Sequence, residues 1–196
     1  MARALLGSVL RSRLGGALTA GRIVETEAYL GPEDAASHAA FRPSSHDLFF
    51  GPGGVAYVFL AYGMHACLNA ITGRRGAPGC VLIRALEPVD GVEVMARRRG
   101  LPPGSPALAN GPAKLTRALA VTLRENGTDL TRGPLTIVPA GDDADLDVAI
   151  GPRVGITRAT DLPLRFWIRG NRYVSRPHPA RHPDWVASRP KSPAPA

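Results

Sequence analysis

The 196-residue sequence has little cysteine and no long hydrophobic run. Cys67 and Cys80 form no C-x-x-C pair, which excludes a disulfide framework and a zinc knuckle, so we expect two free thiols in or near a core. No stretch approaches the roughly 18 apolar residues that a membrane-spanning helix needs. Residues 1–14 are interrupted by Arg11 and Arg13 and precede no small-residue cleavage site, which disfavours a secretory signal. A reducing, cytoplasmic location away from membranes is therefore expected.

Acidic residues are scarce as well. The 16 Asp and Glu residues oppose 24 Lys and Arg residues, which gives a formal net charge of +8. Such a surplus favours polyanionic partners, of which nucleic acid is the most common. Charge by itself leaves acidic membranes, ribosomal partners and a plain solvated surface open.

The length and the turn-forming residues limit the architecture. A chain of 196 residues suits one domain with a real core. Its 22 glycines and 19 prolines predict many loops and short elements rather than a long helical bundle. We expect one domain over residues 1–176, followed by a Pro- and Arg-rich segment, residues 177–196, that is expected to be disordered.

Hydrophobic patterning predicts a mixture of helices and strands. Two runs rich in β-forming residues flank the dipeptide Tyr62-Gly63, which predicts a hairpin over residues 55–71. The other expected elements are helices over 2–14, 89–99 and 112–123, and strands over 22–30, 80–86, 135–138 and 164–169.

The strand over residues 22–30 carries two carboxylates. Period-two alternation divides its side chains between two faces: Ile23, Glu25, Glu27 and Tyr29 on one, and Val24, Thr26, Ala28 and Leu30 on the other. The second face is mostly apolar and is expected to face the core. Glu25 and Glu27, about 7 Å apart by strand rise, can divide into a general base and a supporting charge. A solvated strand face is the alternative.

Several acids and histidines near this strand are possible metal ligands: Glu27, Asp34, His38, His46 and Asp47. None shows the i, i+4 histidine pairing or the close Cys/His spacing of a dedicated metal site, so no metal is expected. His38 taken alone is more often a loop histidine bonded to the backbone than a catalyst.

The predicted hairpin combines aromatic rings with a basic protein. Tyr57, Phe59 and Tyr62 could stack on bases or wedge between them. Alternatively, Tyr57 and Phe59 are core residues and Tyr62 is a surface ring. A tyrosine at a hairpin tip is unusual, because tips favour small polar residues.

Basic residues provide candidate phosphate contacts: Arg74, Arg75, Arg84, Arg97, Arg98, Arg99, Lys114 and Arg117. Lys114 follows a Gly-Pro at a predicted helix start, where free backbone N–H groups attract anions. Each of these residues, taken alone, is better explained as a solvated surface charge.

Taken together and in order, these segments closely resemble the alkyladenine (3-methyladenine) DNA glycosylase family. The resemblance extends from about residue 5 to residue 175. It is carried by residues 22–34 (RIVETEAYLGPED) with His38, 57–64 (YVFLAYGM) with Asn69, 81–88 (VLIRALEP), 111–115 (GPAKL), 153–156 (RVGI) and 163–167 (PLRFW).

The resemblance implies a reaction and the residues that perform it. A damaged purine is flipped out of double-stranded DNA, and its N-glycosidic bond is hydrolysed to leave an abasic site. Glu27 would activate the attacking water, Arg84 would help to place that water and the neighbouring phosphate, and Tyr62 would fill the gap in the duplex. No cofactor and no catalytic lysine are implied.

The resemblance also implies a base pocket. Tyr29, His38 and Phe59 would sandwich the extruded base, the backbone amide of His38 would read its 6-substituent, and Asn69 would crowd a guanine 2-amino group. Phe59 stands where better-known relatives carry tyrosine, so stacking is retained but the hydroxyl is lost. Lys114, Arg74 and Arg75 are weaker candidates for contacts to the DNA backbone.

We therefore expect a single α+β domain: a curved, mainly antiparallel sheet with flanking helices and a protruding β-hairpin. A monomeric, metal-independent repair enzyme that works on the nucleoid is the preferred interpretation. The alternative is a non-enzymatic module that binds distorted DNA or structured RNA through Tyr62 and the arginines without using Glu27.

Overall fold

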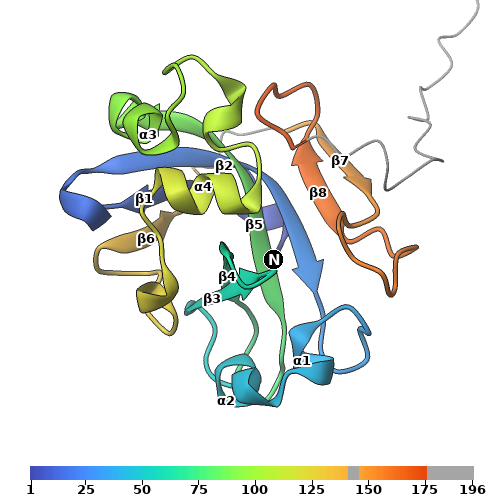
Figure 1. Cartoon of the computed structure of the whole chain (residues 1–196). Coiled ribbons are helices and arrows are strands. Elements are labelled where there is room, and N and C mark those ends of the chain that lie inside the picture. Colours follow the sequence, from blue (N-terminus) through green and yellow to red (C-terminus); the bar gives the residue numbers. More distant parts are fainter. Residues whose placement is uncertain (141–145, 176–196) are drawn as a thin grey trace, which may run out of the picture.

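Eight antiparallel strands form one open sheet in the computed structural model, which describes residues 1–140 and 146–175 (Figure 1). The strands are β1 (Val9–Ser12), β2 (Thr19–Tyr29), β3 (Ala56–Ala61), β4 (His65–Ile71), β5 (Cys80–Asp90), β6 (Leu135–Val138), β7 (Val148–Gly151) and β8 (Arg165–Ile168). Their order is β3-β4-β5-β2-β1-β6, and β8 joins β7 to β2. Four α-helices accompany them within the described residues: α1 (His38–Phe41), α2 (His46–Phe49), α3 (Val92–Arg99) and α4 (Pro112–Ala118). The expected α+β class is confirmed.

Strand β2 is shared between two partners along one edge. Its first half, Thr19–Arg22, pairs with β1, and its second half, Glu25–Glu27, pairs with β8. Opposite β5, its register shifts between Ile23 and Glu25 and again between Glu25 and Thr26. Such a bulge changes which face a side chain occupies. Ile23 is consequently in the core cluster and not beside Glu25 and Glu27, so its predicted face was wrong.

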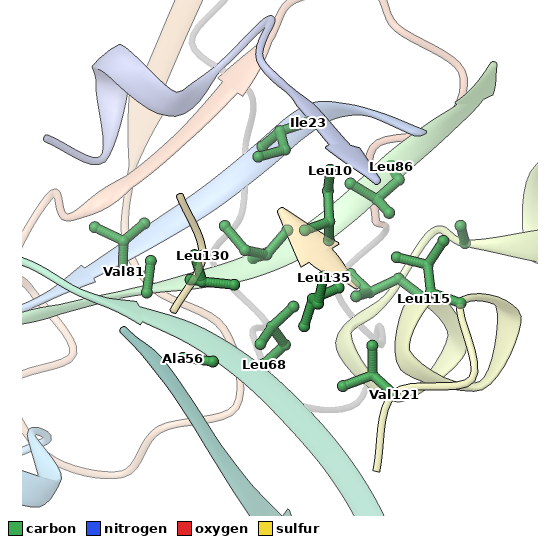
Figure 2. Close-up of a cluster of buried hydrophobic side chains, with 14 of the residues drawn as sticks. Leu10, Ile23, Ala56, Leu68, Val81, Leu86, Leu115, Val121, Leu130 and Leu135 are labelled. Carbon is green, nitrogen blue, oxygen red and sulfur yellow. The ribbon is translucent and has the colours of Figure 1, made fainter. Parts of the chain in front are cut away.

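The main core lies between the sheet and helix α4 (Figure 2). Leu10, Ile23 and Leu86 come from three adjacent strands, and Leu115 comes from α4. Burying each such side chain contributes about 1.5–3 kcal/mol. A second cluster under the hairpin contains Phe49, Tyr57, Ile71 and Cys80. Both cysteines are free and buried, as expected.

The amino-terminal segment differs from the predicted helix. Only Arg3–Leu5 form a 3-10 turn, and Gly7 then adopts a φ of +85°, which ends any helical path. The following residues form β1, which pairs with β2 on one side and with β6 on the other. Two ladders of backbone hydrogen bonds outweigh the weak amphipathic pattern of residues 2–14.

Helices α3 and α4 are shorter than predicted, because residues at one end of each predicted helix adopt another conformation. Strand β5 continues through Asp90, so α3 begins only at Val92. Helix α4 ends at Ala118, before Ala120 takes a left-handed φ of +57°. Within the described ranges, no helix is long and apolar enough to cross a membrane. The predicted boundary after residue 176 and the segment 177–196 fall outside those ranges.

The predicted hairpin is confirmed as β3 and β4, which pair from Ala56–Ala70 to Ala61–His65. Strand β4 pairs with β5 only from Asn69 to Ile71. The tip half of the hairpin therefore extends beyond its pairing with the sheet. At the tip, Tyr62 and Gly63 have φ values of 53° and 72°, and the Tyr62 side chain is largely exposed. The tip is thus a tight turn that displays an aromatic ring.

Candidate active site

A cavity of about 660 Å³ opens beside the hairpin. Its walls come from the end of β2, the segment around α1, the hairpin, β5 and the loop after Arg153. Six residues predicted from the sequence line it: Tyr29, His38, Phe59, Tyr62, Asn69 and Arg84. Segments far apart in the sequence therefore bring the predicted base-pocket residues, Tyr62 and Arg84 together around one space.

Glu27 lies directly behind the wall of this cavity and is fully buried. Its Oε2 accepts hydrogen bonds from the Tyr29 hydroxyl at 3.0 Å and from Arg84 Nη1 at 3.2 Å. Its Oε1 accepts one from the Val154 backbone N–H at 2.6 Å. All three donors belong to residues that line the cavity. Since a carboxylate has about four acceptor positions, one position on Oε1 remains for a further donor.

Arg84 joins the two glutamates of β2. Its Nε donates to Glu25 Oε1 at 3.1 Å, while Nη1 reaches Glu27. Burial alone would lower the pKa of the guanidinium, but the charges of Glu27 and Glu25 raise that pKa above its usual value. Arg84 is therefore a fixed cation at the boundary between the cavity and the buried carboxylates.

Tyr29 is held in place on two sides. Its hydroxyl donates to Glu27, and the Arg153 guanidinium lies 4.6 Å from its ring centroid. Burial, followed by the negative charge of Glu27, raises the pKa of the tyrosine well above 10.0. The ring is a neutral, immobilised aromatic surface in the cavity wall.

His38 begins helix α1 and contacts two rings of the hairpin. Its Nδ1 lies 2.7 Å from the Tyr57 hydroxyl, and its ring centroid is 4.4 Å from that of Phe59. The Ser45 hydroxyl is bonded to the same Tyr57 oxygen at 3.1 Å. Burial, with a smaller effect of Arg42, lowers the pKa of His38 from 6.5 to about 4. The imidazole is therefore neutral at physiological pH.

Asn69 is fixed by its own contacts. Its amide nitrogen donates to the Tyr57 carbonyl oxygen at 3.1 Å, and its oxygen lies 3.8 Å from Cys80 Sγ. The side chain is buried and lines the floor of the cavity at the point where β4 meets β5. An amide held at both ends presents a rigid steric boundary.

The predicted phosphate contacts separate into different places. Lys114 is on α4, and its Nζ is 2.8 Å from Asn110 Oδ1. Arg74 and Arg75 are exposed in the turn between β4 and β5, at the end of β4 opposite Tyr62. Arg98 and Arg99 instead donate to carbonyl oxygens of Ala118 and Leu108 and hold loops together. The sequence did not predict these carbonyl partners for the two arginines.

The supporting roles of several residues in the site were not predicted from the sequence. Tyr57 and Ser45 support His38, Asp34 pairs with Arg153 behind Tyr29, and Val154 donates to Glu27. Arg153 and Val154 do lie in a segment that carries the family resemblance, which was a usable signal. Among the described residues, no group of three or more His, Cys, Asp and Glu side chains could hold a metal ion.

Comparison with known proteins agrees with this geometry. The family model described as Methylpurine-DNA glycosylase (MPG) matches residues 1–172. A protein of Methanoculleus marisnigri is 47% identical over 179 residues, which cover 90% of this chain and 92% of the relative. A protein of Koribacter versatilis is 49% identical over 178 residues, which cover 88% of this chain and 86% of the relative. Both carry the provisional name 3-methyladenine DNA glycosylase.

The fold and the site thus define a DNA repair glycosylase, a hydrolase that acts on N-glycosyl bonds. The chain belongs to the methylpurine-DNA glycosylase family. This membership decides between the two interpretations of the sequence in favour of the enzyme, and DNA is its substrate.

Proposed function

We propose that the protein is a monofunctional, monomeric glycosylase that removes alkylated or deaminated purines from double-stranded DNA on the nucleoid. It extrudes the damaged nucleotide into the cavity beside the hairpin, and Glu27 activates the water that attacks the sugar C1′. The product is an abasic site in an uncut strand, because among the described residues no lysine lines the cavity to form a covalent intermediate.

One observation carries this proposal: a buried carboxylate with one unused acceptor position stands behind the wall of a cavity lined by aromatic rings. A water bonded to Glu27 Oε1 would lie near the Arg84 side chain and the Val154 backbone N–H. Both residues line the same cavity wall. Glu27 can take its proton while the charge of the carboxylate stabilises an oxocarbenium-like sugar. A cationic lesion is already a good leaving group and needs less assistance than a neutral one.

The cavity suits a purine in size and in chemistry. Tyr29, His38 and Phe59 contribute three rings, and stacking is worth about 1–3 kcal/mol per base. That gain is comparable to the few kcal/mol that base flipping costs. His38 is the first residue of α1, where a backbone N–H has no acceptor within the helix and can donate to a base. Asn69, held rigidly, would exclude a guanine 2-amino group.

The hairpin tip is suited to enter the duplex. Tyr62 is 74% exposed and has a positive φ, which is unfavourable for a bulky residue. Backbone strain at an exposed aromatic residue is more readily explained by contact with a partner than by stability. We assign Tyr62 the role of filling the space that the extruded nucleotide leaves.

Lys114 is the better placed of the predicted phosphate contacts. Thr116 on the same helix donates to the carbonyl of Ala66 at 2.9 Å, so α4 lies beside the tip half of the hairpin. Arg74 and Arg75 follow the far end of the seven-residue strand β4, roughly 20 Å away by strand rise. They would contact only DNA that continues along the hairpin.

The test uses duplexes that carry one hypoxanthine, 3-methyladenine or ethenoadenine, scored for abasic sites by cleavage in alkali. We expect release of at least one lesion, no strand cleavage before alkali, and no effect of EDTA. Glu27→Gln should lower the rate about 10²–10⁴-fold and leave DNA binding intact.

Glu33→Gln is the matched control, since Glu33 is an exposed acid near the same strand end. It should excise at the wild-type rate. If folded wild-type protein released none of the three lesions, the proposed substrates would be wrong. Equal rates for wild type and Glu27→Gln would remove Glu27 from the mechanism.

A further inference from the structure

We propose that Glu25 is a positioning residue for the reaction, and that together with Ser175 it sets the orientation of Arg84 beside Glu27. Glu25 does not line the cavity and is fully buried. Its role would be to act through Arg84, so the inference rests on the proposed function of the Glu27–Arg84 pair.

The Glu25 carboxylate accepts four hydrogen bonds, one of them from Arg84 Nε. Oε1 accepts from Arg84 Nε at 3.1 Å, from Arg165 Nε at 2.7 Å and from the Ser175 hydroxyl at 2.8 Å. Oε2 accepts from the Ser175 backbone N–H at 2.7 Å. Because these donors surround the carboxylate, Glu25 cannot turn toward another partner without leaving buried donors unpaired.

Arg84 is oriented by this arrangement. Its planar guanidinium presents Nε to Glu25 and Nη1 to Glu27 at the same time. With Glu25 neutral or displaced, the guanidinium could rotate so that two of its nitrogen atoms donate to Glu27. That rotation would occupy the acceptor position on Glu27 that the attacking water needs. Glu25 therefore keeps the catalytic carboxylate available by holding one edge of the arginine.

Ser175, far from Glu25 in the sequence, connects the members of this hydrogen-bond network. Its hydroxyl accepts from Arg84 Nη2 at 3.4 Å while donating to Glu25, and its carbonyl accepts from Arg165 Nη2 at 3.0 Å. Arg165 is on β8, which pairs with the Glu25–Glu27 half of β2. Two arginines and two glutamates thus balance in charge within one buried cluster.

The experiment compares Glu25→Gln and Ser175→Ala with wild type in single-turnover excision with enzyme in excess. Affinity for a duplex with an abasic-site analogue is measured in parallel and counts the folded, binding-competent molecules. Displacement of a catalytic group by about 1 Å can cost about 10²-fold in rate. We expect Glu25→Gln to lower the rate at least about 10-fold and Ser175→Ala to lower it several-fold. Dissociation constants should change by less than about 3-fold, because an effect confined to the reaction step lowers the rate without weakening binding.

Two further variants separate positioning from stability. Ser175→Thr keeps the hydroxyl and should restore the wild-type rate. Glu87→Gln removes a carboxylate paired with Arg22 on the same two strands, away from the cavity, and should change melting temperature without changing the rate. A purely structural role for Glu25 would lower melting temperature but leave the rate per binding-competent molecule unchanged.

Each outcome has one meaning. If wild type excises and both Glu25→Gln and Ser175→Ala excise equally fast, the inference is overturned and the proposed function stands. If Glu25→Gln does not fold, Ser175→Ala against Ser175→Thr decides, because these variants alter only the hydroxyl contacts. If wild type releases no lesion, the proposed function fails, and the positioning role fails with it.

Discussion

The Arg153 guanidinium lies against the Tyr29 ring and is paired at the same time with the carboxylate of Asp34. Both members of the ion pair are inaccessible to solvent. Asp34 also accepts from the backbone N–H groups of Leu30 and Ala36. The Asp34–Arg153 ion pair therefore connects the backbone turn after β2 to the Tyr29 ring in the cavity wall.

Asp34→Asn should destabilise the protein by about 3–5 kcal/mol, because removing one partner leaves a buried guanidinium uncompensated. Urea unfolding measures the change. Asp129→Asn is the control, since it breaks a surface pair with Arg132, and such pairs contribute about 0–1 kcal/mol. A loss below about 1 kcal/mol for Asp34→Asn would mean that Arg153 finds another partner.

Tyr62→Gly should separate stability from activity. Glycine adopts a positive φ without strain, so the free energy of unfolding should stay the same or rise by up to about 1 kcal/mol. Excision should fall at least 10-fold because the gap in the duplex is left unfilled. Ile150→Ala, at another exposed apolar side chain on β7, should leave excision unchanged. Full activity of Tyr62→Gly would contradict the assigned role.

Phe59 should act through its ring alone. Phe59→Leu removes stacking worth about 1–3 kcal/mol, so kcat/KM should fall by about 5- to 150-fold for every lesion. Phe59→Tyr keeps the ring and adds a hydroxyl. It should therefore change the relative rates for different lesions more than the overall rate of excision. Excision assays on hypoxanthine and ethenoadenine duplexes in parallel measure both effects. Unchanged rates for Phe59→Leu would place the base elsewhere in the cavity.

His38 should give the protein a pH-dependent stability. Its pKa is about 4 in the folded state and 6.5 in the unfolded chain, so the unfolded chain binds the proton first as pH falls. The contribution of this group is fully present above pH 6.5 and is lost progressively between pH 6.5 and 4. His38→Gln should show a shallower loss across this window in urea unfolding. An NMR titration of the imidazole with a midpoint near 6.5 would refute the assignment.

Cys67 should react slowly with alkylating reagents although it lines the cavity. Burial raises the pKa of its thiol to about 11, so very little thiolate exists at pH 8. We expect alkylation of the native protein to be at least roughly 100-fold slower than that of the urea-unfolded chain. Mass spectrometry after iodoacetamide treatment follows both. Equal rates would indicate an open, polar environment around the sulfur.

Much of the site could be predicted because its residues lie in short strings whose spacing is locally determined. Glu27 and Tyr29 share a strand face, and Tyr62 is placed at a hairpin tip by the dipeptide that it forms with Gly63. The residues that support them were less accessible to prediction. Tyr57 looked like a core residue, and Arg165 had no local signal of its contact with Glu25, which is 140 positions away.

The errors in the fold have a common cause. Residues 2–14 look amphipathic, but β1 is stabilised by strands on both sides, one of which begins at Leu135. The bulge that turns Ile23 into the core arises where β2 changes partners from β1 to β8. Neither effect leaves a periodic trace in the local sequence, because both depend on segments that meet only in the folded chain.

Glu25 and Ser175 are separated by 150 positions. Since proteins emerge from the ribosome amino end first, Glu27, Tyr29 and Arg84 are synthesised long before the serine that completes their surroundings. Val154, which donates to Glu27 and belongs to the cavity wall, likewise follows Arg84 by 70 positions. The contacts around the Glu27–Arg84 pair are therefore complete only when nearly all of the described chain is present.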